Sequence, residues 1–208
     1  MKIRVRAALF AATSLALFAA ATPAAQANVL SILPGSCGNQ VESQPFARWG
    51  DTANYVLVPG GAFEAGSPAW TLSGRAGVVA GNESYYVRNT ADKRSLALPS
   101  GSSALSPAVC TSIYHPTLRL FVKNSGSASS RLKAEVLYPG PLGDVQVAKV
   151  GDLSGTSAWQ PTPELPLTVT NVLATLSLGR TAIAYRFTPE DSLGKWSVDD
   201  VYVDPRMK

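Results

Sequence analysis

Hydrophobic residues in most of this chain occur in short runs of β-branched, aromatic and leucine residues, closed about every ten positions by Gly, Pro, Ser or Asn. Such runs are typical of β-strands, whereas the 3.6-residue repeat of an amphipathic helix is nearly absent after the N-terminal segment. The pattern predicts longer strands at residues 117–123, 131–138, 145–150, 167–173, 181–187 and 195–203. It predicts shorter ones at residues 55–58, 70–73, 77–79, 84–88, 95–98 and 108–113. Many short strands without helices predict an all-β protein, a single antiparallel β-sandwich of the jelly-roll type.

Two predicted strands bring charged and aromatic residues together. In strand 117–123 three aliphatic residues point to one side of the sheet, and Arg119 and Phe121 point to the other. A second strand places Tyr185 next to Arg186. Aromatic rings can stack on the apolar face of a sugar while Arg donates to its hydroxyls, so these four residues are candidates for a glycan-binding surface. The alternative is a covered sheet face on which each Arg is paired with a loop acid.

Trp159 is a fifth candidate for glycan binding. It lies in a Pro-containing stretch at residues 157–163, which we expect to be a surface loop. Its ring either packs the loop onto the sandwich or projects as a platform for a sugar. Other aromatic residues outside the predicted core positions are Trp49, Trp70, Tyr85 and Tyr86.

The N-terminal segment differs from the rest of the chain. Three basic residues precede an apolar run at residues 7–21, and the small residues Ala25 and Ala27 follow it. This order predicts a signal peptide at residues 1–27 and a mature domain at residues 28–208. The apolar run is shorter than the roughly 20 residues that span a bilayer, and no later run approaches that length. We therefore expect a secreted, extracellular protein with no membrane insertion after cleavage, and the Ala-rich leader is typical of bacteria.

The predicted mature chain is nearly neutral. Removal of the leader takes away three basic residues and no acidic ones, leaving 15 basic and 14 acidic residues and a formal charge of +1. Without a net positive field, we expect neither nucleic acid nor an anionic membrane as a partner. The mature length suits a single domain with its own hydrophobic core, and we expect a monomer.

Cys37 and Cys110 are the only cysteines. An even count in an exported chain predicts a disulfide between them. Closing a loop of about 73 residues would stabilise the fold by roughly 4 kcal/mol in the chain-entropy view. The alternative is a pair of buried free thiols.

Two adjacent carboxylates, Asp199 and Asp200, stand in the middle of the last apolar strand. Burial of such a pair is costly unless a cation binds it, an Arg pairs with it, or one carboxylate reaches solvent. Glu64, in an early segment of the mature chain, is a third acid that could meet them. Acids from opposite ends of one domain suggest a structural calcium site.

Two segments of the chain resemble a known family. The string GGAFEAGSPAWTLSGRAGVV, at residues 60–79, resembles the N-G-x-F-E-x-G…W opening of calcium-containing carbohydrate-binding modules with a galactose-binding-like jelly roll. The string KWSVDDVYVD, at residues 195–204, resembles their closing strand, x-[IL]-D-D-V-x-[IL]. The centre of the chain matches only loosely. The resemblance implies a non-catalytic binding module with one structural calcium.

The resemblance also implies the calcium ligands. The Glu of the F-E pair and the first Asp of the D-D pair typically bind the ion, which assigns Glu64 and Asp199, with Asp200 as a further ligand. The carbonyl of Gly61 or Ala62 would supply a backbone oxygen. Ligands that are all oxygens suit Ca²⁺, whereas zinc and copper prefer His or Cys.

The alternative for these acids needs no metal. Glu64 would cap a turn, and the two aspartates would pair with Arg75 or Arg180.

Enzymatic activity has little support in the sequence. His115 is the only histidine, no G-x-S-x-G motif is present, and there is neither a phosphate-binding loop nor metalloprotease spacing. We expect no catalytic residues. The sequence predicts a secreted, non-catalytic module that binds carbohydrate, such as an extracellular or cell-wall glycan. The alternatives are a cell-surface structural or protein-interaction domain without a sugar site, and a small glycan-active enzyme.

Overall fold

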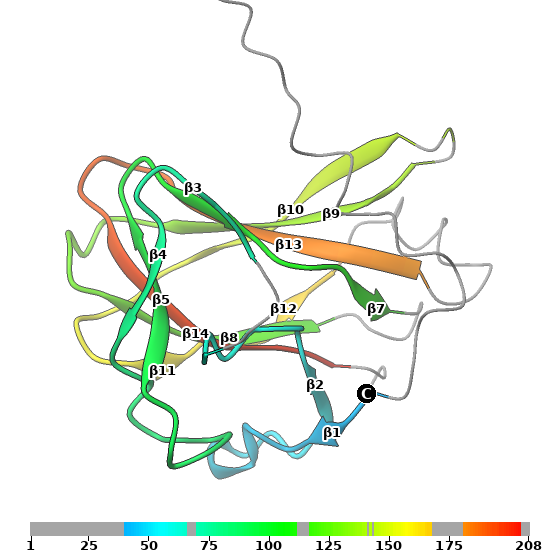
Figure 1. The fold of residues 1–208 in the computed structure, drawn as a ribbon, viewed down its shortest axis with the longest axis horizontal. Helices are drawn as coiled ribbons and strands as arrows, with labels where there is room; N and C mark the ends of the chain where they lie inside the picture. Colours follow the sequence, from blue (N-terminus) through cyan, green and yellow to red (C-terminus); the bar gives the residue numbers. More distant parts are fainter. Residues whose placement is uncertain are drawn as a thin grey trace, which may run out of the picture.

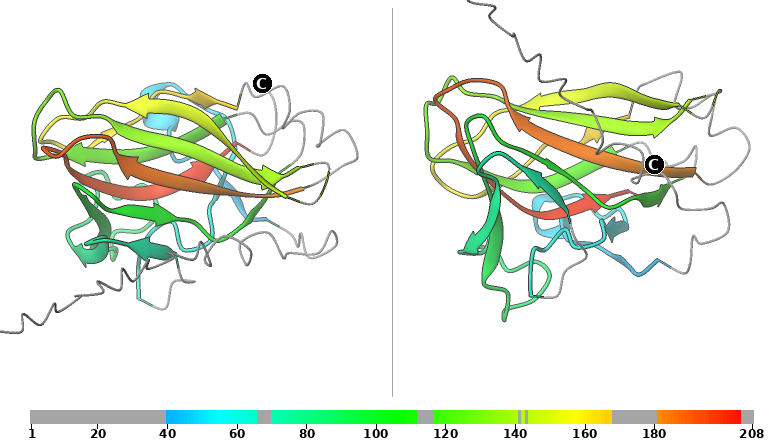
Figure 2. Two further views of the ribbon diagram at one scale, coloured as in Figure 1. Left: turned by 90° about the horizontal axis from the view of Figure 1, so that it is seen from above. Right: turned by 45° about the horizontal axis from the view of Figure 1, so that its top comes forward.

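The computed structural model describes residues 40–65, 70–111, 117–140, 142, 144–167 and 181–204, which form two antiparallel sheets packed face to face (Figure 1). The sheets lie over each other as separate layers in two further views (Figure 2). The predicted all-β sandwich is therefore confirmed. The predicted signal peptide, Cys37 and His115 lie outside the described residues. Within the described ranges, no helix has the length and hydropathy needed to cross a membrane.

Sheet 1 is built around its C-terminal strand. That strand, β14, pairs with β2 and β5 along one edge and with β8 along the other. The eight strands of sheet 1 are β1 (Glu42–Ser43), β2 (Tyr55–Leu57), β4 (Gly77–Ala80), β5 (Arg94–Pro99), β8 (Thr117–Asn124), β11 (Gln160–Pro161), β12 (Leu165–Pro166) and β14 (Lys195–Val203). The first and last strands of the described chain thus lie in one sheet, with β2 beside β14.

Sheet 2 covers the inner face of sheet 1. Its central strand is β13, which pairs with β9, β6 and β7. The six strands are β3 (Thr71–Ser73), β6 (Ser103–Leu105), β7 (Val109–Thr111), β9 (Leu132–Pro139), β10 (Val145–Leu153) and β13 (Thr181–Pro189).

The core between the sheets follows the predicted alternation. In β8 the aliphatic residues Leu118, Leu120 and Val122 are buried in it. From β13, Ile183 and Tyr185 enter the same core. The period of two along each strand is what sends these side chains to one face and the intervening ones to the other.

Some sequence predictions of strands were wrong or incomplete. Residues 84–88 form turns, because the Glu83 carboxylate accepts the N–H groups of Tyr85 and Val87, which a strand would donate to a neighbouring strand. The strands β1, β6, β11 and β12 and the short 3₁₀ helix η1 (Ala47–Trp49) were not predicted. The predicted strand at 167–173 lies almost wholly outside the described residues.

Candidate functional site

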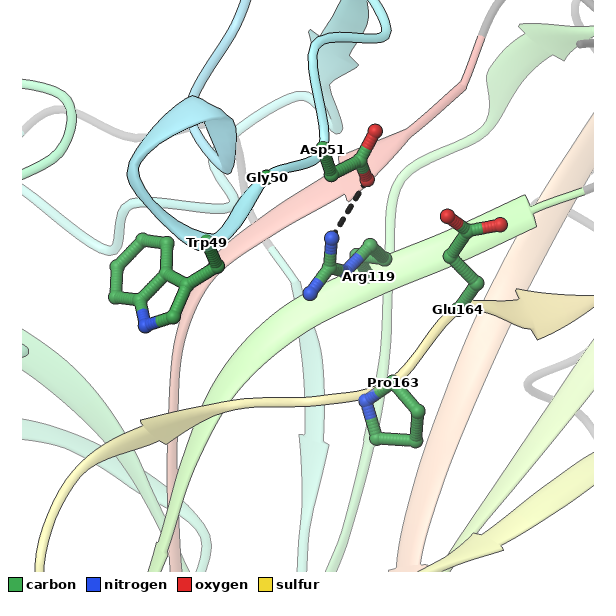
Figure 3. A pocket seen from close by; sticks show the side chains of 6 residues that line it. All are labelled: Trp49, Gly50, Asp51, Arg119, Pro163 and Glu164. Atoms are coloured by element: carbon green, nitrogen blue, oxygen red, sulfur yellow. Dashed lines mark hydrogen bonds and ion pairs between the residues drawn. The ribbon is translucent and has the colours of Figure 1, made fainter.

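An open depression lies on the outer face of sheet 1, the face turned away from sheet 2. It has a volume of about 540 Å³. Figure 3 shows that three segments line it: η1 and the residues after it, β8, and the connection between β11 and β12. The lining residues are Trp49, Gly50, Asp51, Arg119, Pro163 and Glu164. The depression therefore combines one aromatic ring with a guanidinium and two carboxylates.

The charged floor of the depression is held rigidly. The Nη1 of Arg119 donates to Oδ2 of Asp51 at 2.6 Å, and its Nε and Nη2 donate to the carbonyl of Thr162 at 3.1 and 2.9 Å. Its guanidinium carbon lies 4.0 Å from the ring centroid of Phe46. The hydroxyl of Tyr55 donates to the same Asp51 oxygen at 2.5 Å, and burial together with this carboxylate raises the pKa of Tyr55. The Arg119 guanidinium and the Asp51 carboxylate are thus already fixed in place by hydrogen bonds within the protein.

A cluster of aromatic residues covers the sheet beside the depression. This aromatic cluster consists of Phe46, Tyr55, Phe121, Trp159 and Tyr202, with Trp49 and Tyr85 packed against it. Phe46 belongs to the segment before η1, and its ring stacks on that of Phe121 at 5.5 Å. Figure 1 shows the segment that contains η1 lying on the far side of β8 and β14 from sheet 2. The chain therefore covers most of its own aromatic surface.

The residues that the sequence suggested for glycan binding lie in three different places. Arg119 and Phe121 share the outer face of sheet 1, but Phe121 is 0% exposed. Trp159 is 9% exposed in the aromatic cluster, and the ammonium of Lys123 lies 4.9 Å from its ring centroid. The Trp159 ring therefore packs its loop onto the sandwich, which is one of the two interpretations that the sequence allowed.

The other two candidate residues belong to sheet 2. Tyr185 is fully buried in the core between the sheets, where its hydroxyl has no hydrogen-bond partner and burial raises its pKa. Arg186 points to the opposite side of β13 and donates to Oε2 of Glu135 at 2.8 Å. No single surface can therefore include Phe121, Tyr185 and Arg186, because alternation and the thickness of the sandwich separate them.

The early and late segments that contain the predicted calcium ligands lie side by side. The carbonyl of Gly61 accepts the N–H of Val201 at 3.1 Å, and the carbonyl of Val201 accepts the N–H of Val58 at 2.8 Å. Ala62 is buried next to them. A Cβ atom on Gly61 would lie 2.9 Å from the Val58 carbonyl oxygen and 3.0 Å from that of Val201, so this contact requires glycine.

A β-bulge in β14 explains how two adjacent aspartates fit into an apolar strand. Asp199 is opposite Phe121 and Tyr202 is opposite Arg119, so three steps along β14 match two along β8. The extra residue lets Asp199 and Tyr202 share the outer face, whereas uninterrupted alternation would place them on opposite faces. Asp200 within the bulge has a φ of 45°, a left-handed conformation that Asp tolerates better than most residues.

Five carboxylates lie near enough to one another around this bulge for their charges to interact. This acidic cluster consists of Glu64, Glu83, Asp92, Asp199 and Asp200. Burial, with a smaller contribution from the charge of Asp200, raises the pKa of Asp199 to about 9. Burial, followed by the charges of Glu83 and Asp92, raises the pKa of Asp200 to about 7, and Arg88 opposes the shift. Glu64 is near enough for its charge to add to this shift.

Hydrogen bonds satisfy part of the acidic cluster. Asp199 accepts the N–H groups of Glu83 and Asp200 at 2.8 and 2.9 Å. Glu64 accepts the N–H groups of Lys93 and Arg94 at 2.7 and 2.8 Å, much as the metal-free alternative expected.

Asp200 differs from these two acids. It is 1% exposed, and neither of its carboxylate oxygens has a hydrogen-bond partner. One oxygen of Asp92 is also unpaired, and its other oxygen pairs with Arg88.

The carboxylate oxygens of the acidic cluster are the type of donor atom that a hard cation prefers. Across the ranges that the structure describes, no three Asp, Glu, His or Cys side chains converge into a metal site as they stand. The unpaired oxygens of Asp200 and Asp92 are nevertheless the kind of group that Ca²⁺ coordinates, and a buried carboxylate without a partner is costly. The predicted calcium stays a prediction.

Cys110 is half-buried on β7 and is not a free thiol. Its predicted partner, Cys37, lies outside the described residues, so the pairing stays a prediction.

The sequence did not identify most residues of these two sites. The sequence marks Trp49 only as an aromatic residue outside the predicted core, next to the turn-forming Gly50. It marks Glu83 only as an acid next to the turn-forming Asn82. No sequence pattern indicated Asp51 or Glu164 as site residues, because the depression is formed by three segments that only the fold brings together.

No protein-family model matches the sequence, and no curated protein sequence matches it. Several solved structures resemble the fold. The CBM22-1 xylan-binding domain of Xyn10C from Paenibacillus barcinonensis is 16% identical; the match covers 67% of this chain and 87% of that domain, with a TM-score of 0.47. TmCBM61, solved with β-1,4-galactotriose, is 18% identical, with coverages of 71% and 96% and a TM-score of 0.41. The family 11 carbohydrate-binding module of Lic26A-Cel5E from Clostridium thermocellum is 11% identical, with coverages of 82% and 98% and a TM-score of 0.42. These three structures are carbohydrate-binding modules, and the similarity of the chain to each is distant, with a TM-score of 0.47 or lower.

Proposed function

We propose that this chain is a secreted, non-catalytic module that binds a glycan in the depression beside Trp49. The observation that carries the proposal is the composition of that depression: a half-buried indole on one side, and a guanidinium with two carboxylates on the others. The depression is also within the size range, roughly 300–1,000 Å³, of sites for small ligands. The N-terminal sequence supports export.

The polar groups of the depression suit sugar hydroxyls. Arg119 uses three of its five N–H donors in the bonds to Asp51 and Thr162, which leaves two for a ligand. The carboxylate of Glu164 is in an exposed position and can accept from hydroxyls. Because Arg119 is already fixed, little conformational entropy would be lost when a sugar binds.

The outer face of sheet 2 is a weaker candidate for glycan binding. The aromatic residues in the strands of sheet 2 are Tyr138, Tyr185 and Phe187, and all three belong to the core between the sheets. Glu135 and Arg186 on the outer face are engaged with each other at 2.8 Å. These strands therefore present no ring on which a sugar could stack.

Calorimetric titration of the mature chain with xylohexaose and with β-1,4-galactotriose, preceded by a glycan-array screen, tests the proposal. For a glycan that binds, Trp49→Ala should weaken binding about tenfold or more, because the stacking surface is lost. Glu164→Gln should also weaken binding, because its exposed side chain lines the depression and would lose its charge.

Tyr86→Ala is the matched control, because Tyr86 is 47% exposed and does not line the depression. It should bind like the wild type. Equal binding by the wild type, Trp49→Ala and Glu164→Gln would contradict the assignment of the site.

The second part of the proposal is a structural Ca²⁺ at the acidic cluster. Asp200 would hold it, with Asp92 and Glu64 beside it and backbone oxygen from Gly61 or Ala62. The unpaired buried oxygens of Asp200 and Asp92 support this set. Asp199 is the weakest of the sequence-based ligands, since both of its oxygens already accept N–H groups. The ion would add positive charge to a group of acids that Arg88 alone opposes around Asp200.

Thermal unfolding with CaCl₂ or with EDTA tests the cation. Saturating Ca²⁺ should raise the free energy of unfolding by about 3 to 4 kcal/mol. Asp200→Asn should abolish this gain. Asp152→Asn, which removes an acid that pairs with Lys149 on the other sheet, should keep it. A gain that survives in Asp200→Asn would contradict the assignment.

A second candidate function is a cell-surface structural or protein-interaction domain. The burial of Phe121 and Trp159 favours it, because the chain itself covers the rings that would otherwise face a ligand. Absence of glycan binding in the screen would leave this function as the better one.

A further inference from the structure

We propose that the turn at residues 81–92 couples the acidic cluster to the Trp49 depression, so that Ca²⁺ binding near Asp200 strengthens glycan binding beside Trp49. The inference rests on the proposed function and adds a connection between its two sites. Residues of this one turn make contacts in both places.

At one end, the turn is attached to the bulge of β14. The N–H of Glu83 donates to Oδ2 of Asp199 at 2.8 Å, and Glu83 is 0% exposed. The carboxylate of Glu83 accepts the N–H groups of Tyr85 and Val87, which fixes the backbone between them. A displacement of the bulge is therefore transmitted to Tyr85 through two hydrogen bonds in series. The bond between Asp199 and Glu83 is buried, and the one between Glu83 and Tyr85 is partly buried.

At the other end, Tyr85 supports the wall of the depression. Its ring meets that of Trp49 edge to face, with the centroids 4.9 Å apart and the planes at 90°. Its hydroxyl donates to the carbonyl of Trp159 at 3.0 Å. The guanidinium carbon of Arg48 lies 5.0 Å from the Trp49 centroid and 4.9 Å from the Tyr85 centroid, which holds the two rings as one unit. The position of the Trp49 indole therefore depends on Tyr85.

The charges around Asp200 explain why the turn would respond to a cation. The turn itself supplies Glu83, Asp92 and Arg88, while Glu64 and Asp199 face Asp200 from neighbouring segments. Four carboxylates thus surround Asp200, and one guanidinium opposes them. When these acids are ionised and no cation is bound, repulsion between β14 and the turn acts against the contact between them. A bound cation would draw Asp92 and Asp200 together and so hold the turn, with Tyr85, against the sheet.

The coupling must act in both directions. A ligand that stacks on Trp49 and fixes Tyr85 would raise the affinity for Ca²⁺ by the same factor as Ca²⁺ raises the affinity for the ligand.

The first experiment measures glycan affinity by calorimetry, with the glycan identified in the screen, in saturating CaCl₂ and in EDTA. For the wild type we expect a fivefold or larger gain in affinity with Ca²⁺. Tyr85→Ala should keep the Ca²⁺-dependent rise in melting temperature but lose the gain in glycan affinity. Tyr85→Phe, which keeps the ring, and Tyr86→Ala, next to it in the chain, should retain the gain.

The second experiment needs no glycan. Hydrogen–deuterium exchange is compared, with and without CaCl₂, in peptides that cover residues 81–92 and 44–51. In the wild type Ca²⁺ should slow exchange in both peptides, and in Tyr85→Ala only in the first. Slowing confined to residues 81–92 in the wild type, or no effect of Ca²⁺ at all, would overturn the coupling. If no glycan binds, the proposed function fails, and this experiment still decides whether Ca²⁺ at the acidic cluster affects the segment that contains Trp49.

Discussion

Asp200 is unusual in both its backbone conformation and the environment of its side chain. Its backbone is in the left-handed region with a φ of 45°, its side chain is 1% exposed, and both carboxylate oxygens lack a partner. A conformation of this kind costs of order 1 kcal/mol or more, and it persists only where the surrounding structure imposes it. The neighbouring Asp199, by contrast, is fully hydrogen-bonded and anchors a turn.

The raised pKa values of these two aspartates predict an unusual pH dependence in EDTA. Their folded-state pKa values are about 9 for Asp199 and about 7 for Asp200, against an ordinary value of 3.8. The folded state therefore holds protons that the unfolded state releases, and the free energy of unfolding should fall as the pH rises through these two values. Melting curves recorded in EDTA between about pH 6 and pH 9 measure this loss of stability.

Asp200→Asn provides the comparison for this pH dependence. Its fall in melting temperature should be smaller than that of the wild type, because one of the two titrating groups is gone. A melting temperature that is constant or rises with pH in the wild type would show that the aspartates are ionised in the folded protein without cost.

At the scale of elements, the fold depends on how closely the segment at residues 58–64 approaches β14. Gly61 makes the approach possible, because its carbonyl reaches the N–H of Val201 and a Cβ atom would be 3.0 Å from the Val201 carbonyl oxygen. The bulge in β14 begins just before this contact. The two features together bring Glu64 into the neighbourhood of Asp200.

Gly61→Ala should therefore destabilise the protein. The added methyl group would meet backbone oxygen atoms of Val58 and Val201, which cannot move aside as a flexible side chain could. We expect a loss of about 1 to 3 kcal/mol in the free energy of unfolding, measured by denaturant titration.

Gly77→Ala is the matched control for Gly61→Ala. Gly77 lies on β4 with no atom within 4 Å of the Cβ position, so its replacement should be neutral or slightly stabilising. Equal stability of the two variants would contradict the argument from close approach.

At the scale of the whole molecule, the two outer faces of the sandwich differ in chemistry. The outer face of sheet 1 has the aromatic cluster and the depression, whereas the described outer face of sheet 2 has ion pairs such as Arg186 with Glu135. If glycan binding belongs to sheet 1, Arg186→Ala should leave glycan affinity within about twofold of the wild type. Calorimetry alongside Glu164→Gln measures this, and a large loss in Arg186→Ala would move the site to sheet 2.

The sequence by itself determined the strands and their faces. Hydrophobic runs and turn residues predicted most of the observed strands, and alternation placed Leu120 in the core and Arg119 on the outer face. These features are local, because a period of two and a turn depend only on neighbouring residues. The segments around Glu64 and Asp199 were also expected to approach each other, and they lie side by side.

Only the tertiary structure decided which side chains meet and which remain accessible. Phe121 and Trp159 are covered by segments distant in sequence, Tyr185 faces the core, and Glu83 and Asp92 join Asp200 through a turn that had been predicted as a strand. The depression combines Trp49, Arg119 and Glu164 from three segments. Such groupings cannot be read from local patterns, because burial and charge depend on contacts between residues far apart in the chain.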